Sequence, residues 1–415
     1  MVLWRDDRVL SQIALPRWGR VVAVDEAVPW RVLDDAGDVV GPIGIYLADF
    51  IARGNASASL RSYAYALLRW WRWLQVVETD WDKATSAEVK DFVLWFSWAT
   101  KQRRAARTAS AATAGTVNPI TRKRYLDDRY QPRTVRHSNA VLRDFYEFWI
   151  DRGSGPLINP VRLDRSAHRP HAHHNPLDVF RNEGRIAYNP KLPKQAPRAL
   201  PDERWTDLFG ALRSNRDRAL LAVTVSSAAR ASEVLGIRGA DVDWGEQLVC
   251  VRRKGSQAPQ WLPVSPEAMV WLRLYLADVG QQPRSDEPLW WTLRRRDHGN
   301  GLHRLPMNYE ALRAVFRRVN AILGTNWTMH DLRHTAALRM SRDPSLTMRD
   351  VQTILGHAHL STTADVYMVE EQDQVIRRVA TYLAEREQHK QRNTTTVADG
   401  YDGDALAILF GGDSQ

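Results

Sequence analysis

Cysteine is nearly absent from this chain of 415 residues. The single cysteine, Cys250, excludes an internal disulfide framework and favours a reducing compartment. It lies in the apolar run QLVCV, which is typical of a small core residue. No run of about 20 apolar residues occurs, so no membrane span is predicted. The first residues, MVLWRDDRVL, lack the apolar segment of a secretory signal, and a cytoplasmic globular protein is therefore expected.

Acidic residues are outnumbered in this sequence. There are 58 Lys and Arg against 48 Asp and Glu, a formal net charge of +10. Hydrophobic residues make up 44% and charged residues 26%, as in ordinary globular proteins. The length predicts two or three domains of roughly 150 residues each. The basic balance favours a polyanionic partner, most often nucleic acid.

The first part of the chain is predicted to be helical after a short extension. Residues 1–40 contain two β-like runs, RVVAV and WRVL, separated by a turn composition, which predicts a small hairpin. Apolar residues then recur at helical spacing between 41 and 165, with Ser86 as one expected N-cap. Trp70 and Trp73 are interpreted as core aromatics of a helical bundle, with interface packing as the alternative. Residues 101–124 are basic without apolar period, and are either a solvated linker or a strap along a phosphate backbone.

A polar stretch divides the chain. Residues 166–196 are expected to be a basic linker, although their histidines raise the alternative of a metal site. No partner cysteine or helical frame supports that alternative. A second domain is expected over 197–390, and a tail over 391–415. The tail contains the apolar run ALAILF, which is typical of a docking segment. The histidines are His168, His171, His173 and His174.

The second domain alternates helix and strand patterns. A buried helix is predicted over 218–238, and strand, turn and strand over 246–266 with Gly255 and Ser256 at the tip. Helices follow, and Gly356 is expected to end one of them. The sequence thus predicts a mainly α fold with a small antiparallel β-sheet, in two lobes. The later helices are expected at 308–323, 328–342, 346–357 and 369–391.

The segment HDLRH, residues 330–334, places two histidines four apart on one helix face, as a zinc site does. A zinc protease helix needs a glutamate after the first histidine, whereas this chain has Asp331. Arg333 would place a cation beside the metal, and no third ligand stands at a diagnostic spacing. A zinc hydrolase is therefore a weak alternative.

Cations at three places, one of them within HDLRH, suggest a different site. Arg230 is expected inside an apolar helix, where a buried charge needs a partner or an anion, and Glu233 lies three residues on. Lys254 lies beside the predicted turn, and Arg333 lies on an ordinary helix. Each is explained by a structural salt bridge alone, but together they would form a cage for phosphate oxygens.

A tyrosine completes this pattern. Tyr367 follows His357 by ten residues. A tyrosine is usually a packing residue. Beside cations that hold a phosphate it can instead be a nucleophile, although its pKa near 10 must be overcome.

Five segments in order resemble the motifs of the tyrosine recombinases, the phage-integrase-like family. They are ARASEVLGIRGADVD, RRKGSQAPQWLPV, HDLRHTAA, LGH and STTADVY. The resemblance covers about 200–380, and 41–165 is similar to the family's helical core-binding (SAM-like) domain. Departures are Ala229, the run SAA in place of the commoner TGL, and a hairpin that lacks a basic residue where many relatives have a second lysine or arginine.

The resemblance implies a fold and a reaction. The fold would be a helical core-binding domain followed by an α+β catalytic domain. Tyr367 would attack a DNA phosphate to give a 3′-phosphotyrosyl link, and Lys254 would protonate the leaving 5′-oxygen. His330 would act as acid or base at the tyrosine. The implied phosphate ligands are Arg230, Arg333 and His357, with Glu233 and His334 as supporting residues.

The resemblance also implies partners. They are double-stranded recombination sites, other copies of the chain in a tetramer with the C-terminal segment in trans, and accessory proteins of a mobile element. A Holliday junction is the implied intermediate, neither ATP nor a metal or other cofactor is required, and a bacterial nucleoid-associated location is expected. Candidate DNA contacts are Arg103, Arg104, Arg107, Arg122, Lys123, Arg124, Arg252 and Arg253.

Two alternatives share much of this pattern. A type IB topoisomerase would use the same nucleophile to relax DNA without exchanging strands. A catalytically silent DNA-binding protein would keep only the scaffold. The target sequence and the kind of element are not predicted by the sequence.

Overall fold

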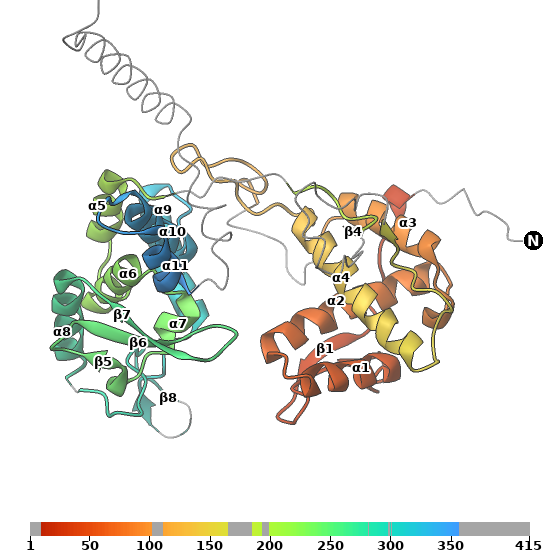
Figure 1. Ribbon diagram of the computed structural model, residues 1–415, viewed down its shortest axis with the longest axis horizontal. Coiled ribbons are helices and arrows are strands. Elements are labelled where there is room, and N and C mark those ends of the chain that lie inside the picture. The colour runs from red at the N-terminus through yellow and green to blue at the C-terminus, as the bar shows by residue number, and fades with distance from the viewer. Residues whose placement is uncertain are drawn as a thin grey trace, which may run out of the picture. The chain divides into compact units, whose positions relative to one another are not determined.

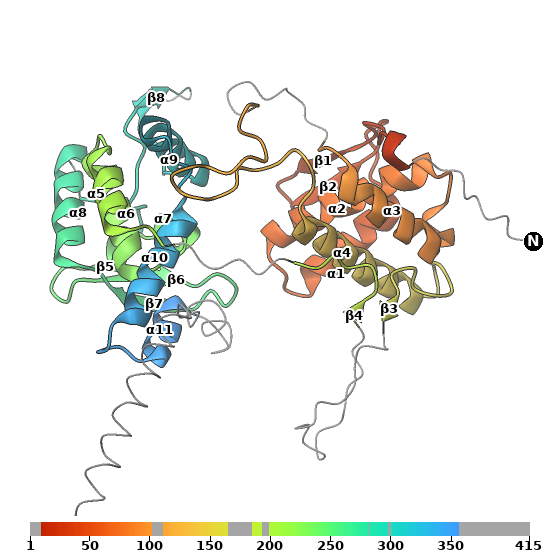
Figure 2. The same ribbon diagram turned by 90° about the horizontal axis from the view of Figure 1, so that it is seen from above.

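Figures 1 and 2 show the computed structural model of the chain, which divides into two compact units. The first unit is Met1–Gln195 with Gly324–Asn326, and the second is Ala196–Leu323 with Trp327–Gln415. The structure describes residues 10–101, 111–164, 185–192, 199–280, 282–297, 299 and 301–356.

Helices surround an aromatic core in the first unit. Trp70 and Trp73 are fully buried there, which confirms their interpretation as core residues. The indole of Trp70 donates a hydrogen bond to the hydroxyl of Tyr146 at 2.8 Å, so a buried polar group is satisfied. The helices of this unit are α1 (Gly41–Ala52), α2 (Ser57–Val76), α3 (Ser86–Trp98) and α4 (Pro132–Asp151), with 3₁₀ turns at Leu10–Gln12 and Trp81–Lys83.

The start of α3 differs by one residue from the expectation. Thr85, not Ser86, is the N-cap, because its backbone is extended and its hydroxyl accepts from the amide of Ala87. Glu88 completes the turn by accepting from the amide of Thr85 at 2.9 Å.

The predicted N-terminal hairpin is present and packs on the helices. β1 (Arg20–Ala23) pairs antiparallel with β2 (Trp30–Leu33). Arg72 of α2 donates to the carbonyl oxygens of Trp18 at 2.6 Å and Gly19 at 2.9 Å. The described residues before α1 therefore belong to the same packed unit as the helices. A short pair, β3 (Leu163–Asp164) and β4 (Arg185–Ile186), completes its strands.

The second unit combines helices with a three-stranded antiparallel sheet in the order β5–β6–β7. Together with the first unit this confirms a mainly α fold with small antiparallel sheets. Cys250 is buried in β6, as expected of a small core residue. The strands are β5 (Val242–Asp243), β6 (Leu248–Arg252), β7 (Pro259–Pro263), β8 (Arg296–Asp297) and β9 (Leu302–His303).

The helices expected over 308–323, 328–342 and 346–357 are found, and the one expected over 218–238 is not. Gly356 ends α11 with a φ of 60°, as expected. Residues 369–391 lie outside the described residues. The helices are α5 (Asp202–Gly210), α6 (Asn215–Ser227), α7 (Ala231–Leu235), α8 (Pro266–Val279), α9 (Tyr309–Leu323), α10 (Met329–Arg342) and α11 (Met348–Leu355), with a 3₁₀ turn at Gly239–Asp241.

The prediction of one helix over 218–238 is wrong. α6 ends at Ser227, and Ala228 takes a left-handed conformation with a φ of 53°. The hydroxyl of Ser227 donates to the carbonyl of Val223 at 2.6 Å and competes with the helical pattern. Arg230 is therefore the N-cap residue of α7 rather than the middle of a helix.

Within the described residues, no helix combines the length and the apolar character that crossing a membrane requires.

Candidate active site

Arg230 is held by Glu233 at the start of α7. The Arg230 amide donates to Oε2 of Glu233 at 2.9 Å, and its guanidinium donates to Oε1 at 2.8 Å. Glu233 is buried, whereas the Arg230 side chain keeps 30% of its surface exposed. The guanidinium is thus fixed on one side and accessible to a ligand on the other.

The β6–β7 hairpin reaches the same carboxylate. The turn places Lys254 at the surface, and its amide donates to Oε1 of Glu233 at 3.3 Å. Arg253, one residue earlier, donates from Nη1 to Oε2 of Glu233 at 3.0 Å. One buried carboxylate therefore connects the segment of Arg230 with the segment of Lys254.

The surroundings of Glu233 set its charge. Burial raises the pKa of its carboxyl, but the hydrogen bonds from Arg230 and the charges of Arg253 and Arg230 outweigh burial and bring the pKa below the ordinary 4.5. The group is consequently a carboxylate at neutral pH. Its charge offsets the two guanidinium groups packed against it.

The HDLRH segment occupies the first turns of α10. Asp331 accepts hydrogen bonds from the amide of Thr328 at 2.8 Å and from its hydroxyl at 2.7 Å, so its carboxylate caps the helix. The Nε2 atoms of His330 and His334 lie 2.9 Å apart in a hydrogen bond. Among the residues the structure describes, no group of three or more His, Cys, Asp or Glu side chains could hold a metal ion.

Arg333 joins three segments that carry motifs. Its guanidinium is buried, and donates from Nη1 to the carbonyl of Ala228 at 2.6 Å and from Nη2 to the carbonyl of Leu355 at 2.7 Å. Ala228 lies two residues before Arg230, and Leu355 lies two residues before His357. Figure 2 shows α7, α10, α11 and the β6–β7 hairpin gathered in one region of the second unit.

Hydrogen bonds to Glu233 therefore connect Arg230 with Lys254, and Arg333 bonds the carbonyl of Ala228, two residues before Arg230. His330 and His334 lie on the helix that carries Arg333. Two predicted residues, His357 and Tyr367, lie outside the described residues. So does the tail over 391–415.

The predicted DNA contacts fall into three groups. Arg122, Arg124 and Arg252 are exposed, and Lys123 is partly buried. Arg253 is buried, and its guanidinium donates hydrogen bonds to Gln260, Glu233 and Ile354. The remaining three, Arg103, Arg104 and Arg107, lie outside the described residues, as do the linker histidines His168, His171, His173 and His174.

Sequence reasoning missed Gln260, which lies opposite Val251 in the hairpin and contacts the end of α11. The only sign of Gln260 in the sequence is that a polar residue occurs within a predicted strand.

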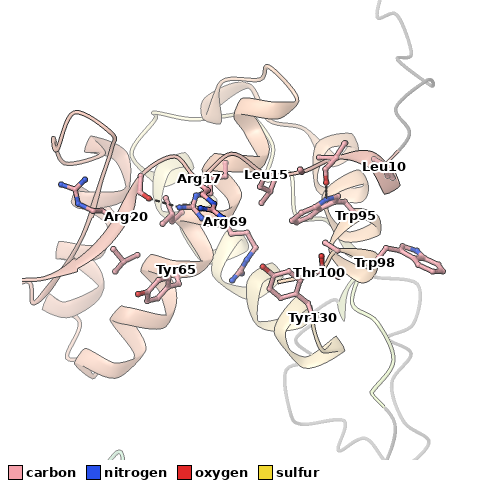
Figure 3. A pocket seen from close by; sticks show the side chains of 17 residues that line it. Leu10, Leu15, Arg17, Arg20, Tyr65, Arg69, Trp95, Trp98, Thr100 and Tyr130 are labelled. Atoms are coloured by element: carbon pink, nitrogen blue, oxygen red, sulfur yellow. Dashed lines mark hydrogen bonds between the residues drawn. The ribbon is translucent and has the colours of Figure 1, made fainter. Parts of the chain in front are cut away.

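A basic hollow of about 970 Å³ lies in the first unit (Figure 3). Arg20 and Tyr65 lie on one side of it, and Thr100 and Trp98 on the other. Arg69 lies over the rings of Phe96 and Tyr130, 4.9 and 5.0 Å from their centroids. Guanidinium and aromatic groups of this kind also line surfaces that bind single-stranded nucleic acid. None of the predicted site residues lines this hollow.

Comparisons with known proteins agree with the motif pattern. The model of the phage integrase family matches residues 200–373, a range that includes both His357 and Tyr367. Tyrosine recombinase XerA of Pyrococcus horikoshii is 25% identical over 58% of this chain and 77% of its own length. Tyrosine recombinase XerC of Chromobacterium violaceum is 33% identical over 42% of this chain, which spans only 57% of that protein.

One relative is similar over most of both chains. Transposase A from transposon Tn554 of Staphylococcus aureus is 21% identical over 87% of this chain and 96% of its own length. Among solved structures, the Tn1549 transposon integrase in complex with a circular intermediate DNA has a TM-score of 0.51 and 12% identity, over 82% of this chain and 99% of that one. At this identity the likeness shows the fold. The family match and the ordered motifs together identify residues 200–373 as a domain of the phage integrase family.

Proposed function

We propose that the protein is a site-specific DNA recombinase of a mobile element, which cuts and rejoins DNA through a 3′-phosphotyrosyl intermediate. One observation carries this proposal: Glu233 and Arg333 tie together the segments of Arg230, Lys254 and the end of α11 by hydrogen bonds. The likeness to a transposase over most of the chain favours recombination of a mobile element over relaxation of DNA.

The reaction is a transesterification in which the number of phosphodiester bonds is unchanged. The oxygen of Tyr367 forms a bond to phosphorus as the bond to the 5′-oxygen breaks. Arg230 and Arg333 stabilise the negative charge that grows on the non-bridging oxygens. Lys254 gives a proton to the leaving 5′-oxygen, and His330 takes the proton of the tyrosine.

The remaining roles belong to the same proposal. His357 donates a hydrogen bond to a phosphate oxygen, and His334 supports His330 through the bond between their rings. The phosphotyrosyl bond stores the energy of the cut bond, so neither ATP nor a metal ion enters the scheme. A 5′-hydroxyl from a second duplex then reverses the step and completes strand exchange through a Holliday junction.

The assembly follows from the same chemistry. Exchange between two duplexes needs four cutting events, and we propose a tetramer on DNA in which the C-terminal segment of one copy packs on the next. DNA recombination sites are the proposed partners, and accessory proteins of the element are further ones. Its place of action would then be the bacterial nucleoid.

A nicked duplex that carries the sequence flanking the element tests the proposal. A nick just 3′ of the cut site lets the short fragment that carries the free 5′-hydroxyl diffuse away, which traps the covalent adduct. We expect wild type to form an adduct that denaturing electrophoresis detects. Tyr367→Phe should form none while binding the same duplex with similar affinity, and an adduct that persists in this variant would contradict the assignment of the nucleophile.

A plasmid with two sites separates recombination from its alternatives. A recombinase yields products with exchanged flanks, which sequencing identifies. Relaxed plasmid without exchanged flanks would indicate a topoisomerase, and binding without any adduct would indicate a silent DNA-binding protein.

A further inference from the structure

Arg253 lies directly before Lys254, yet it is buried and fully engaged. Only 6% of its surface is exposed. Its Nε donates to Oε1 of Gln260 at 2.7 Å, its Nη1 to Oε2 of Glu233 at 3.0 Å and its Nη2 to the carbonyl of Ile354 at 2.5 Å. All three guanidinium nitrogens are thus committed to protein acceptors.

These acceptors lie on three different elements. Glu233 is in α7, Gln260 is in β7, and Ile354 is in the last turn of α11, where helical carbonyls lack partners in the helix. Gln260 adds a bond from its side-chain amide to the carbonyl of Thr353 at 2.9 Å. Arg253, the residue directly before Lys254, therefore bonds the turn to α7 and to α11.

Gly356 lies against the same guanidinium. A Cβ atom on Gly356 would lie 2.8 Å from Nε of Arg253, closer than such atoms approach in real structures. The glycine leaves room for the guanidinium against the end of α11.

Neither the charge of Arg253 nor the volume that it fills explains why its guanidinium makes three directional hydrogen bonds. A planar guanidinium can satisfy acceptors in three directions at once, whereas a lysine ammonium is a compact charge on a flexible stem. An apolar side chain would leave Glu233 with one guanidinium partner instead of two.

We propose that Arg253 is a positioning residue that fixes Lys254 for protonation of the leaving 5′-oxygen. The role rests on the proposed recombinase function. Arg253 touches no DNA itself and acts through the backbone of the turn, which it holds to α7 and α11.

The chemistry of the leaving group gives a sharp test. When sulfur replaces the bridging 5′-oxygen, the leaving group is a thiol with a pKa near 8.5, so it can depart as the thiolate without receiving a proton. A defect in placing Lys254 then disappears, whereas a general loss of structure remains. The full chain with Arg253→Met and with Arg253→Lys is compared with wild type on the nicked duplex and on its sulfur analogue. The rate of adduct formation is measured at saturating protein, with DNA affinity and melting temperature alongside.

We expect both variants to bind DNA like wild type and to form the adduct more slowly, on the order of 100-fold, on the oxygen duplex. On the sulfur duplex they should approach the wild-type rate, as Lys254→Ala should. Arg313→Met, which removes an exposed cation of α9 paired with Glu310, is the control and should match wild type on both.

Two results would overturn this role. They are wild-type rates for both Arg253 variants on the oxygen duplex, or an equal loss of rate on the oxygen and sulfur duplexes. Arg253→Lys keeps the test decisive if Arg253→Met fails to fold. Failure of wild type to form any adduct would instead overturn the proposed function, and this role with it.

Discussion

A single carboxylate organises the described part of the site. Glu233 accepts from the backbone and side chain of Arg230, from Arg253 and from the amide of Lys254. A buried pair that loses one partner leaves an uncompensated charge, which costs far more than the pair contributes. The site is therefore expected to be sensitive to substitutions that keep the size of a side chain and remove its charge.

Glu233→Gln is expected to lower the free energy of unfolding by about 3 kcal/mol at pH 7. Because the pKa of Glu233 is lowered in the folded protein, its contribution is present above the ordinary value of 4.5 and is lost as pH falls through the lowered pKa. The difference in melting temperature between wild type and variant should become smaller as the pH falls from 4.5 through the lowered pKa of Glu233. A difference that grows toward acid pH would contradict the assigned ion pairs.

Arg230→Ala is expected to slow adduct formation about 100- to 1000-fold, because an oxyanion loses one of its donors. The rate at saturating protein on the nicked duplex checks this. The melting temperature is measured alongside and should also fall, because the buried carboxylate of Glu233 loses one of its two guanidinium partners. The rates are therefore compared at a temperature where both proteins are folded. A rate close to wild type would remove Arg230 from the phosphate site.

At the scale of secondary-structure elements, the ends of helices determine where the proposed site residues lie. α7 begins at Arg230, α10 begins with the cap between Thr328 and Asp331, and α11 ends at Gly356. Each proposed catalytic residue among the described residues thus lies near the end of an element or in a turn. Their placement depends on capping interactions of about 1 kcal/mol each.

Asp331→Ala should cost about 1 kcal/mol of stability and loosen the first turn of α10, which carries His330. Adduct formation should slow along with the fall in melting temperature. Glu88→Ala, which removes the equivalent cap of α3 in the first unit, is the matched control. It should lower stability similarly and leave the rate unchanged. Equal rates in the two variants would show that the cap has no part in placing His330.

Arg72→Met should detach the N-terminal segment from α2, because its guanidinium bonds the carbonyl oxygens of Trp18 and Gly19. We expect a cost of about 2 kcal/mol, since hydrogen bonds from charged donors are the strong ones. Hydrogen exchange at Val21 and Val22 should accelerate. Arg69→Met removes a cation from the same helix without touching those carbonyls, and should leave that exchange unchanged.

At the scale of the whole molecule, two separate cores and a basic balance matter most. Each unit buries its own cluster of apolar side chains, around Trp70 in the first and Leu220 in the second. The formal net charge of +10 attracts a polyanion regardless of its sequence. We therefore expect salt to change the affinity for DNA more than it changes the rate of cutting.

DNA affinity should fall steeply with salt, by about 10³-fold between 50 and 200 mM for six or more phosphate contacts. Binding isotherms over that range check this. Arg124→Ala, which removes an exposed cation, should reduce the slope of log affinity against log salt by about one unit. An unchanged slope would exclude Arg124 from the phosphate contacts.

The sequence predicted the elements better than their junctions. Helical periodicity identified α9 and α11, because their apolar residues recur at helical spacing along one face. It missed the break at Ala228, since alanine favours a helix and the left-handed turn is stabilised by Arg333, 105 residues further on. It gave no sign of the bond between Arg253 and Ile354, because 101 residues separate the two in the sequence.

The buried position of Cys250 has a practical consequence. It is the only cysteine of the chain, and burial raises the pKa of its thiol, so its reaction with thiol reagents is suppressed. A cysteine introduced at an exposed site in each unit, such as Trp98 and Tyr309, would therefore take up a fluorescent dye selectively. The distance between two such dyes, followed during strand exchange, would report how the units move as DNA is cut and rejoined.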